Sequence, residues 1–197
     1  DGRPVCSEVR PGNTADVTTL IPVIERLRRR FDIARVCVVA DRGMISAETM
    51  AELEARRLLY ILGVRERSDK LVRELVLTDA APFVPLAMKR RGKEIDYEAK
   101  TVMLAGRRYI VCRNHQEAQK DAADRASIVA ALERQLAKGD KALVGNTGFR
   151  RYLKTISNEH FAIDPDKIEE ERKFDGIFVL RTNTDLNSLE VMLCYKQ

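Results

Sequence analysis

The chain has 197 residues, 45% of them hydrophobic, which is enough for one large domain or for a core with a sizeable insertion. Thirty-five Lys and Arg against 30 Asp and Glu give a net charge of +5, which favours a polyanionic partner without requiring one. There is neither an apolar run of roughly 18 residues nor a basic-then-apolar N-terminus, which argues against a membrane protein and against a secreted one.

The first forty residues alternate between strand and helix patterns. Residues 4–10 are predicted to form a short strand, followed by a turn at 11–13. Apolar residues then recur at the three-and-four spacing of a helix. This helix is expected to begin near residues 18–19, because Pro22 fits only in a first turn. A continuous apolar strand follows at 35–40.

A second helix and a third strand complete this alternation. Ser46 is the predicted N-cap of the helix. Its apolar face is expected to comprise Ala47, Met50, Ala51, Ala55 and Leu58. Another continuous apolar strand covers 59–64. Strands that are apolar on both faces and alternate with helices predict an α/β sheet covered by helices on both sides.

The four cysteines are far apart and none has C-x-x-C spacing. Cys37 lies inside the strand at 35–40 and is expected to be a small core hydrophobe. Cysteine usage of this kind favours a reduced, cytosolic setting.

From about Ser68 the pattern changes. Pro82 and Pro85 are expected to break up the segment before a hairpin at 100–113, which turns at Ala105-Gly106. A long helix follows from about His115, capped by Asn114 and ended by Gly139. Its inner face is predicted from Ile128, Val129, Leu132 and Leu136.

The last third returns to core-type patterns. Residues 140–172 are mixed and mostly polar, and a strand is predicted at 176–183. Asn187 with Glu190 three residues later resembles a capping box that opens a last helix. The chain opens on a turn-like Asp-Gly-Arg-Pro and closes inside this helix, so we expect it to be a fragment of a longer protein.

Asp41 is the main candidate site residue, because it directly follows the apolar strand at 35–40. Ligands of α/β sheets gather at the carboxyl ends of strands, and a carboxylate there can bind a hard divalent cation. Alternatively, Asp41 is a surface residue paired with Arg42 or caps the next helix through a backbone N–H. The histidines His115 and His160 lack zinc-ligand spacing, and no glycine-rich phosphate loop is present.

Three motifs occur in a specific order: P-G-N-T-x-D at 11–16, a strand ending A-D-R-G at 40–43, and D-G-x-x-x-L-x-T-N at 175–183. On these motifs the chain resembles the DDE transposases of bacterial insertion sequences, in the subgroup with a long insertion in the catalytic domain. The resemblance implies an α/β, ribonuclease H-like mixed sheet flanked by helices and interrupted by a mixed β/α insertion. It places the first part of the core at 1–68, the insertion at 69–172 and the return to the core at 173–197.

In the resembling enzymes three carboxylates hold two divalent ions, Mg²⁺ or Mn²⁺, for DNA strand cleavage and strand transfer. Asp41 matches the second acid. The third acid belongs to a Y-x2-R-x3-E-x6-K signature whose tyrosine matches Tyr195, and its arginine and glutamate would fall beyond Gln197. The first acid would precede Asp1. The chain alone is therefore expected to be inactive.

The resemblance also implies the partners. Double-stranded DNA, as transposon ends and target, is the expected substrate, with a homodimer in the synaptic complex and a cytoplasmic location. Arg42 is expected to contact a phosphate or to orient Asp41, with a structural salt bridge as the alternative. The basic turn Arg107-Arg108 and Tyr195 are assigned to DNA contacts. A second hypothesis is a transposase remnant that binds nucleic acid without chemistry.

Overall fold

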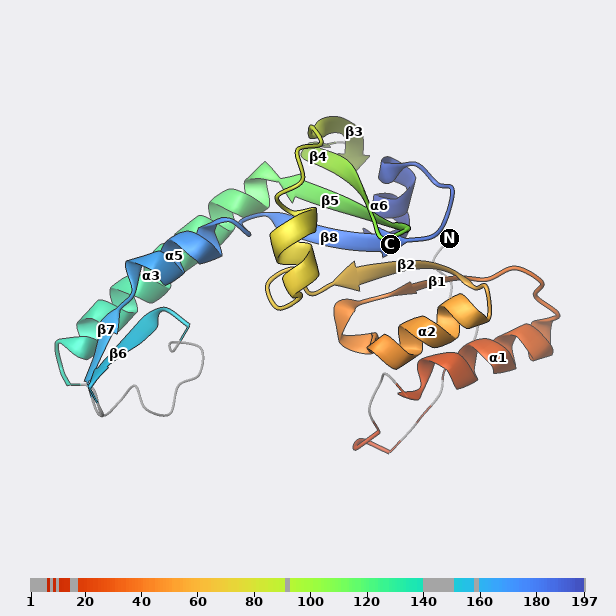
Figure 1. Cartoon of the computed structure of the whole chain (residues 1–197), viewed down its shortest axis with the longest axis horizontal. Coiled ribbons are helices and arrows are strands. Elements are labelled where there is room, and N and C mark those ends of the chain that lie inside the picture. Colours follow the sequence, from red (N-terminus) through yellow and green to blue (C-terminus); the bar gives the residue numbers. More distant parts are fainter. Residues whose placement is uncertain are drawn as a thin grey trace. The chain divides into compact units, whose positions relative to one another are not determined.

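The computed structural model describes residues 7, 9, 11–14, 18–90, 93–139, 151–157 and 160–196 (Figure 1). Its elements in chain order are α1 (Leu20–Phe31), β1 (Cys37–Ala40), the 3₁₀ turn η2 (Arg42–Met44), α2 (Ala47–Ala55), β2 (Leu59–Val64), the π turn η3 (Val72–Val76), β3 (Val84–Arg90), β4 (Lys93–Leu104), β5 (Arg107–Asn114), α3 (His115–Leu136), β6 (Leu153–Ser157), β7 (His160–Ile163), α5 (Pro165–Arg172), β8 (Ile177–Thr182) and α6 (Ser188–Lys196).

Six strands form one mixed sheet in the order β1-β2-β8-β5-β4-β3. β1 and β2 are parallel, with Ala40 opposite Leu62, whereas β2 and β8 are antiparallel, with Leu62 opposite Arg181. Helices flank this sheet, so the fold class is α/β as predicted and is consistent with a ribonuclease H-like fold. β6 and β7 form a separate antiparallel pair.

The chain divides into two compact units, and the division of the sequence into a core and an insertion stays a prediction. The first unit comprises 1–86, 98–112 and 178–197, and the second comprises 87–97 and 113–177. Within the second unit, α3 contacts β7. Leu132 of α3 is fully buried there with Tyr152 and Leu153.

Helices cover both faces of the β1–β2 part of the first unit. One hydrophobic cluster joins α1, α2 and the inward side chains of β1 and β2: Ile24, Val38, Ala40, Met50, Leu53, Leu58, Tyr60 and Leu62. Because side chains alternate along a strand, Gly63 faces away from this cluster. On that opposite side Gly63 lies against Tyr195 of α6. Asp41, which directly follows β1, contacts Tyr195 of the same helix α6.

Several local predictions are confirmed. β2 spans the predicted 59–64, and the hairpin of β4 and β5 turns at Ala105-Gly106, which both have positive φ. The N-caps Ser46 and Asn114 accept backbone N–H groups of the first turns that follow them. Asn187 and Glu190 form the reciprocal capping box at 2.8 and 3.0 Å.

The expected burial of β1 and α2 is wrong in part. Cys37 is exposed rather than a core residue, and Val39 is 45% exposed, because side chains alternate along β1 and only Val38 and Ala40 face the cluster with α1 and α2. On α2 the buried residues are Thr49, Met50 and Leu53. The three alanines Ala47, Ala51 and Ala55 of the predicted face are exposed.

Pro85 does not break the chain as predicted, since β3 runs through it. β3 is the last strand in the described sheet, and proline is tolerated on such an edge because one side of the strand needs no N–H donor. The mostly polar stretch 140–172 contains β6, β7 and α5 in its described part. The predicted strand at 4–10 lies mainly outside the described residues.

Candidate functional site

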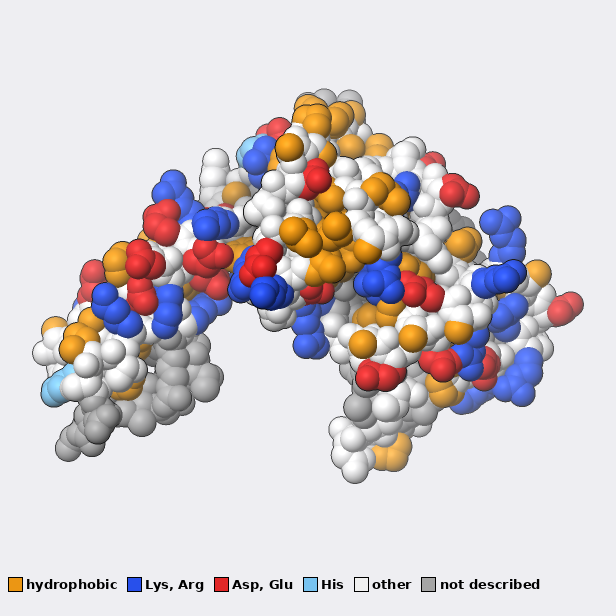
Figure 2. All heavy atoms as spheres, in the orientation of Figure 1, with side chains coloured by type: hydrophobic (Ala, Val, Ile, Leu, Met, Phe, Trp, Pro, Cys, Tyr) orange, Lys and Arg blue, Asp and Glu red, His pale blue; other side chains and the backbone are white. Residues whose placement is uncertain are grey.

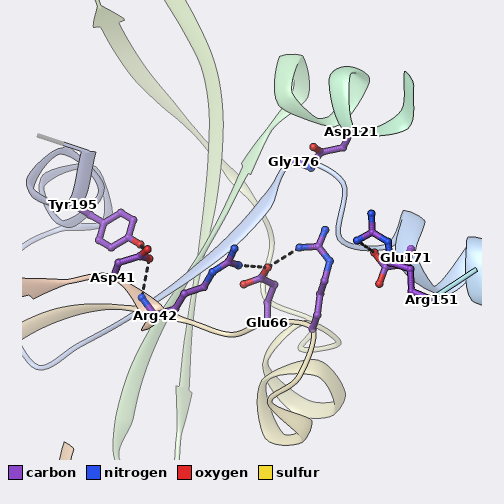
Figure 3. Close-up of polar contacts among 9 residues, drawn as sticks. Asp41, Arg42, Glu66, Asp121, Arg151, Glu171, Gly176 and Tyr195 are labelled. Atoms are coloured by element: carbon purple, nitrogen blue, oxygen red, sulfur yellow. Dashed lines mark hydrogen bonds and ion pairs between the residues drawn. The ribbon is translucent and has the colours of Figure 1, made fainter. Parts of the chain in front are cut away.

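Asp41 ends β1 and caps η2. Its Oδ1 accepts a hydrogen bond from the backbone N–H of Arg42 at 2.7 Å and another from the Tyr195 hydroxyl at 2.8 Å (Figure 3). The Tyr195 hydrogen bond, followed by the Arg42 N–H, lowers the pKa of the Asp41 carboxyl. The residue is exposed, so the site presents an ionised carboxylate to solvent at neutral pH.

Tyr195 reaches Asp41 from α6, 154 positions away in the sequence. Its ring stacks on Phe178 of β8, with a centroid separation of 6.4 Å. Burial first, and then the hydrogen bond to Asp41, raise the pKa of the Tyr195 phenol to about 12. The phenol therefore remains a hydrogen-bond donor to the carboxylate at any physiological pH.

This raised pKa predicts a loss of stability in alkali. A phenol titrates near 10 in the unfolded chain, whereas Tyr195 holds its proton to about 12 in the fold. The free energy of unfolding should therefore fall as the pH rises from about 10 towards 12. Denaturant titrations at pH 9 and 11 should show a smaller fall for Tyr195→Phe than for the natural chain. Some fall should persist, because burial also raises the pKa of Tyr60. An identical fall in both proteins would contradict the assignment.

Arg42 forms an ion pair with Glu66 and none with Asp41 in the described part of the chain. Its Nη1 lies 3.2 Å from Glu66 Oε1, which also accepts from Arg67 Nη1 at 3.0 Å. Glu66 is only 3% exposed, and these two guanidinium groups compensate its buried charge. The salt-bridge alternative for Arg42 is thus observed, with an unpredicted partner. One feature of the sequence could have indicated Glu66 as a partner of Arg42: it closely follows β2, the strand that runs parallel to β1.

A pocket of about 400 Å³ opens beside η2 and the start of α2. Four arginines contribute to its lining: Arg42, Arg65, Arg107 and Arg181. Arg107 is held by Glu54, with Nε to Oε1 and Nη2 to Oε2 both at 3.2 Å. No ion pair of the Arg65 or Arg181 side chain occurs among the described residues. Asp69 also lines the pocket, so its lining carries four guanidinium groups and one carboxylate, an excess of positive charge that is suited to phosphate.

Arg108 lies apart from this pocket. Its Nη2 donates to the backbone oxygens of Thr184 and Leu186 at 2.7 and 2.6 Å. The structure thus brings together Asp41, Arg42 and Tyr195, and Arg107 shares a pocket with Arg42. Arg108 instead holds the loop between β8 and α6. The predicted DNA contacts of these residues stay predictions.

The described donors do not by themselves fit a two-ion metal centre. No group of three or more His, Cys, Asp or Glu side chains that could hold a metal occurs in the described ranges. Asp41 accepts from the Arg42 backbone N–H and the Tyr195 phenol, and Glu66 is occupied by two arginines. Likewise, none of the described helices is both long and apolar enough to cross a membrane.

A family model described as a transposase DDE domain matches residues 1–197. No curated protein and no solved structure matches the chain.

Proposed function

Because the chain belongs to the transposase DDE domain family, a family of polynucleotidyl transferases that act on DNA and generally use divalent metal ions, we propose that it is catalytic-domain sequence of a bacterial insertion-sequence transposase. Asp41 is the proposed catalytic acid. The observation that carries this role is its position: an exposed, ionised carboxylate at the end of β1, fixed by Tyr195 and the Arg42 N–H.

The residues of this chain would contribute charge and position. Asp41 would supply one of the three acids of the reaction, and the arginines of the adjacent pocket would bind DNA phosphates. Two Mg²⁺ or Mn²⁺ ions are the proposed cofactors. On the motif resemblance, we propose that the other two acids lie outside residues 1–197 and that this chain alone is inactive. A homodimer acting in the cytoplasm on transposon ends and target DNA belongs to the same proposal.

The test is strand cleavage of the element's own terminal DNA by the complete reading frame. With Mg²⁺ or Mn²⁺ we expect strand cuts at the element ends, and with a chelator we expect none. Metal-independent cutting would contradict the proposed reaction class. An inactive mutant of the DNA end, with the terminal base pairs changed, serves as the control for specificity.

A non-catalytic DNA-binding remnant is the second candidate. The observation that suits it is the gathering of Lys and Arg side chains over α1, which can contact DNA phosphates (Figure 2). The last turn of α1 alone carries Arg28, Arg29 and Arg30. Binding of terminal DNA without cutting, with or without metal, would support this candidate against the first.

Both candidates predict that the arginine pocket binds DNA. Replacing Arg65 and Arg181 by glutamine should weaken DNA binding, because these two side chains have no described ion pair. The slope of log affinity against log salt should become shallower by about one for each phosphate that the variant no longer binds. Arg35→Gln is the matched control, since Arg35 is exposed near the opposite end of β1. Fluorescence anisotropy over a salt series measures both effects, and equal slopes for all variants would exclude the pocket.

A further inference from the structure

We propose that Gly63 is a positioning residue: the absence of a side chain at this position of β2 makes the space in which the Tyr195 hydroxyl reaches Asp41. The close approach of Gly63 to Tyr195 does not depend on the reaction. Its importance for catalysis rests on the proposed function of Asp41.

The close approach is measured directly. A Cβ atom added to Gly63 would lie 2.5 Å from the Tyr195 hydroxyl oxygen and 3.2 Å from Cζ of the same ring. It would also lie 3.1 Å from the backbone N of Arg42, the other group that hydrogen-bonds Asp41. Contacts of 2.5 Å are well inside van der Waals distance, so any side chain here must displace something.

Position 63 requires glycine because it has no side chain, and not because of its backbone conformation. The described glycines with positive φ are Gly106, Gly139 and Gly176, and Gly63 is not among them. Alanine can adopt the Gly63 conformation, so its effect comes from the added methyl group.

The Tyr195 hydroxyl is the group that should yield. β2 pairs with β1 on one side and β8 on the other, and its neighbours Ile61 and Leu62 are almost completely buried. A strand fixed in this way cannot move away from a new methyl group without disturbing the core. The hydroxyl, by contrast, is the far end of a side chain that rotates about two bonds. Displacing it removes one of the two hydrogen bonds that fix the Asp41 carboxylate.

Crystal structures and Tyr-selective NMR of four variants of the complete protein test this. The variants are Gly63→Ala, Tyr195→Phe, the double variant, and Gly43→Ala. Gly43 is the matched control: it is in the same site, within η2, but a Cβ there would meet no atom within 4 Å. We expect Gly63→Ala to break the 2.8 Å contact between Tyr195 and Asp41, and Gly43→Ala to leave it intact.

A double-mutant cycle shows whether Gly63 acts through the hydroxyl. The changes in Tm caused by Gly63→Ala and by Tyr195→Phe should be non-additive. The reason is that the double variant lacks the Tyr195 hydroxyl oxygen, the atom that the methyl group meets first. This holds even if Gly63→Ala alone folds poorly, since removing the hydroxyl should then restore folding. A retained 2.8 Å contact in Gly63→Ala, or additive effects, would overturn the proposal.

The cleavage assay separates this inference from the proposed function. If the natural protein cuts DNA, Gly63→Ala should lower kcat about as far as Tyr195→Phe does, and the double variant should be no slower. Structures that retain the contact refute the role of Gly63 whatever the activity. Absence of cutting by the natural protein would refute the proposed function and leave the structural result standing.

Discussion

Replacing Asp41 with asparagine is expected to abolish DNA cleavage by the complete protein while leaving its fold and DNA binding in place. The amide is close in shape to the carboxylate but carries no charge, so the acid that the reaction needs is lost. The single-turnover rate should drop by roughly 10²–10³-fold or more, as when one group that stabilises a transition state is removed.

The fold should tolerate this change because Asp41 is exposed. The asparagine oxygen can still accept from the Arg42 N–H, so the loss of stability should be about 1 kcal/mol or less. Thermal unfolding and terminal-DNA binding, measured on the sample used for cleavage, provide the controls. An asparagine variant that folds, binds and cuts like the natural protein would show that the Asp41 carboxylate is only a cap.

Of the substitutions proposed for this chain, Gly176→Ala should lower the free energy of unfolding the most. Gly176 has φ +63° in the turn before β8, and an added Cβ would lie 2.2 Å from the backbone oxygen of Asn114 and 2.8 Å from the backbone N of Ala118. The same turn is fixed by a hydrogen bond from Gly176 N to Asp121 Oδ2 at 2.9 Å, two residues that Figure 3 labels. A second bond, also of 2.9 Å, runs from Asn114 N to Gly176 O. The Ala118 Cβ would lie 2.9 Å from the added Cβ as well, and the two nearer atoms belong to backbone, so neither can rotate away.

We expect Gly176→Ala to lower the free energy of unfolding by about 3–5 kcal/mol, from strain and from the displaced start of α3. Gly106→Ala separates the two causes. Gly106 has a similar φ of +73°, but an added Cβ would meet nothing within 4 Å, so only the cost of the backbone conformation, about 1 kcal/mol, applies. Denaturant unfolding measures both values. Equal losses for the two variants would contradict the clash at Gly176.

Local signals explain which parts of the fold could be predicted. The caps at Ser46, Asn114 and Asn187 depend on residues two or three positions apart, and the structure has all three. The turn at Ala105-Gly106 needs two residues of positive φ, which the short link between two apolar runs indicated.

The burial of individual side chains could not be predicted from the local sequence pattern alone. Thr49 of α2 is buried, and its hydroxyl is satisfied by Ser46, a contact that a hydrophobic pattern does not record. The alanines of the predicted face carry too little apolar surface to decide which side of the helix packs. Cys37 is exposed because it alternates with Val38 and Ala40, the β1 side chains that α1 and α2 cover.

The candidate site was predictable residue by residue but not as an arrangement. The strand end and the motif pointed to Asp41, and the helix signature pointed to Tyr195. That the two touch is a tertiary contact across 154 positions, which no spacing rule provides. Glu66 was missed because its burial depends on Arg42 and Arg67 closing over it.

Asp41 and Glu66 are the carboxylates that follow β1 and β2, and their roles can be compared directly. In the complete protein, Asp41→Asn and Glu66→Gln should be assayed side by side for single-turnover cutting of the terminal DNA with Mg²⁺. We expect Asp41→Asn to lose cutting, and Glu66→Gln to keep it within about tenfold, since Glu66 serves its two arginine partners. Loss of cutting in Glu66→Gln with full cutting in Asp41→Asn would contradict the central claim that Asp41 is the catalytic acid.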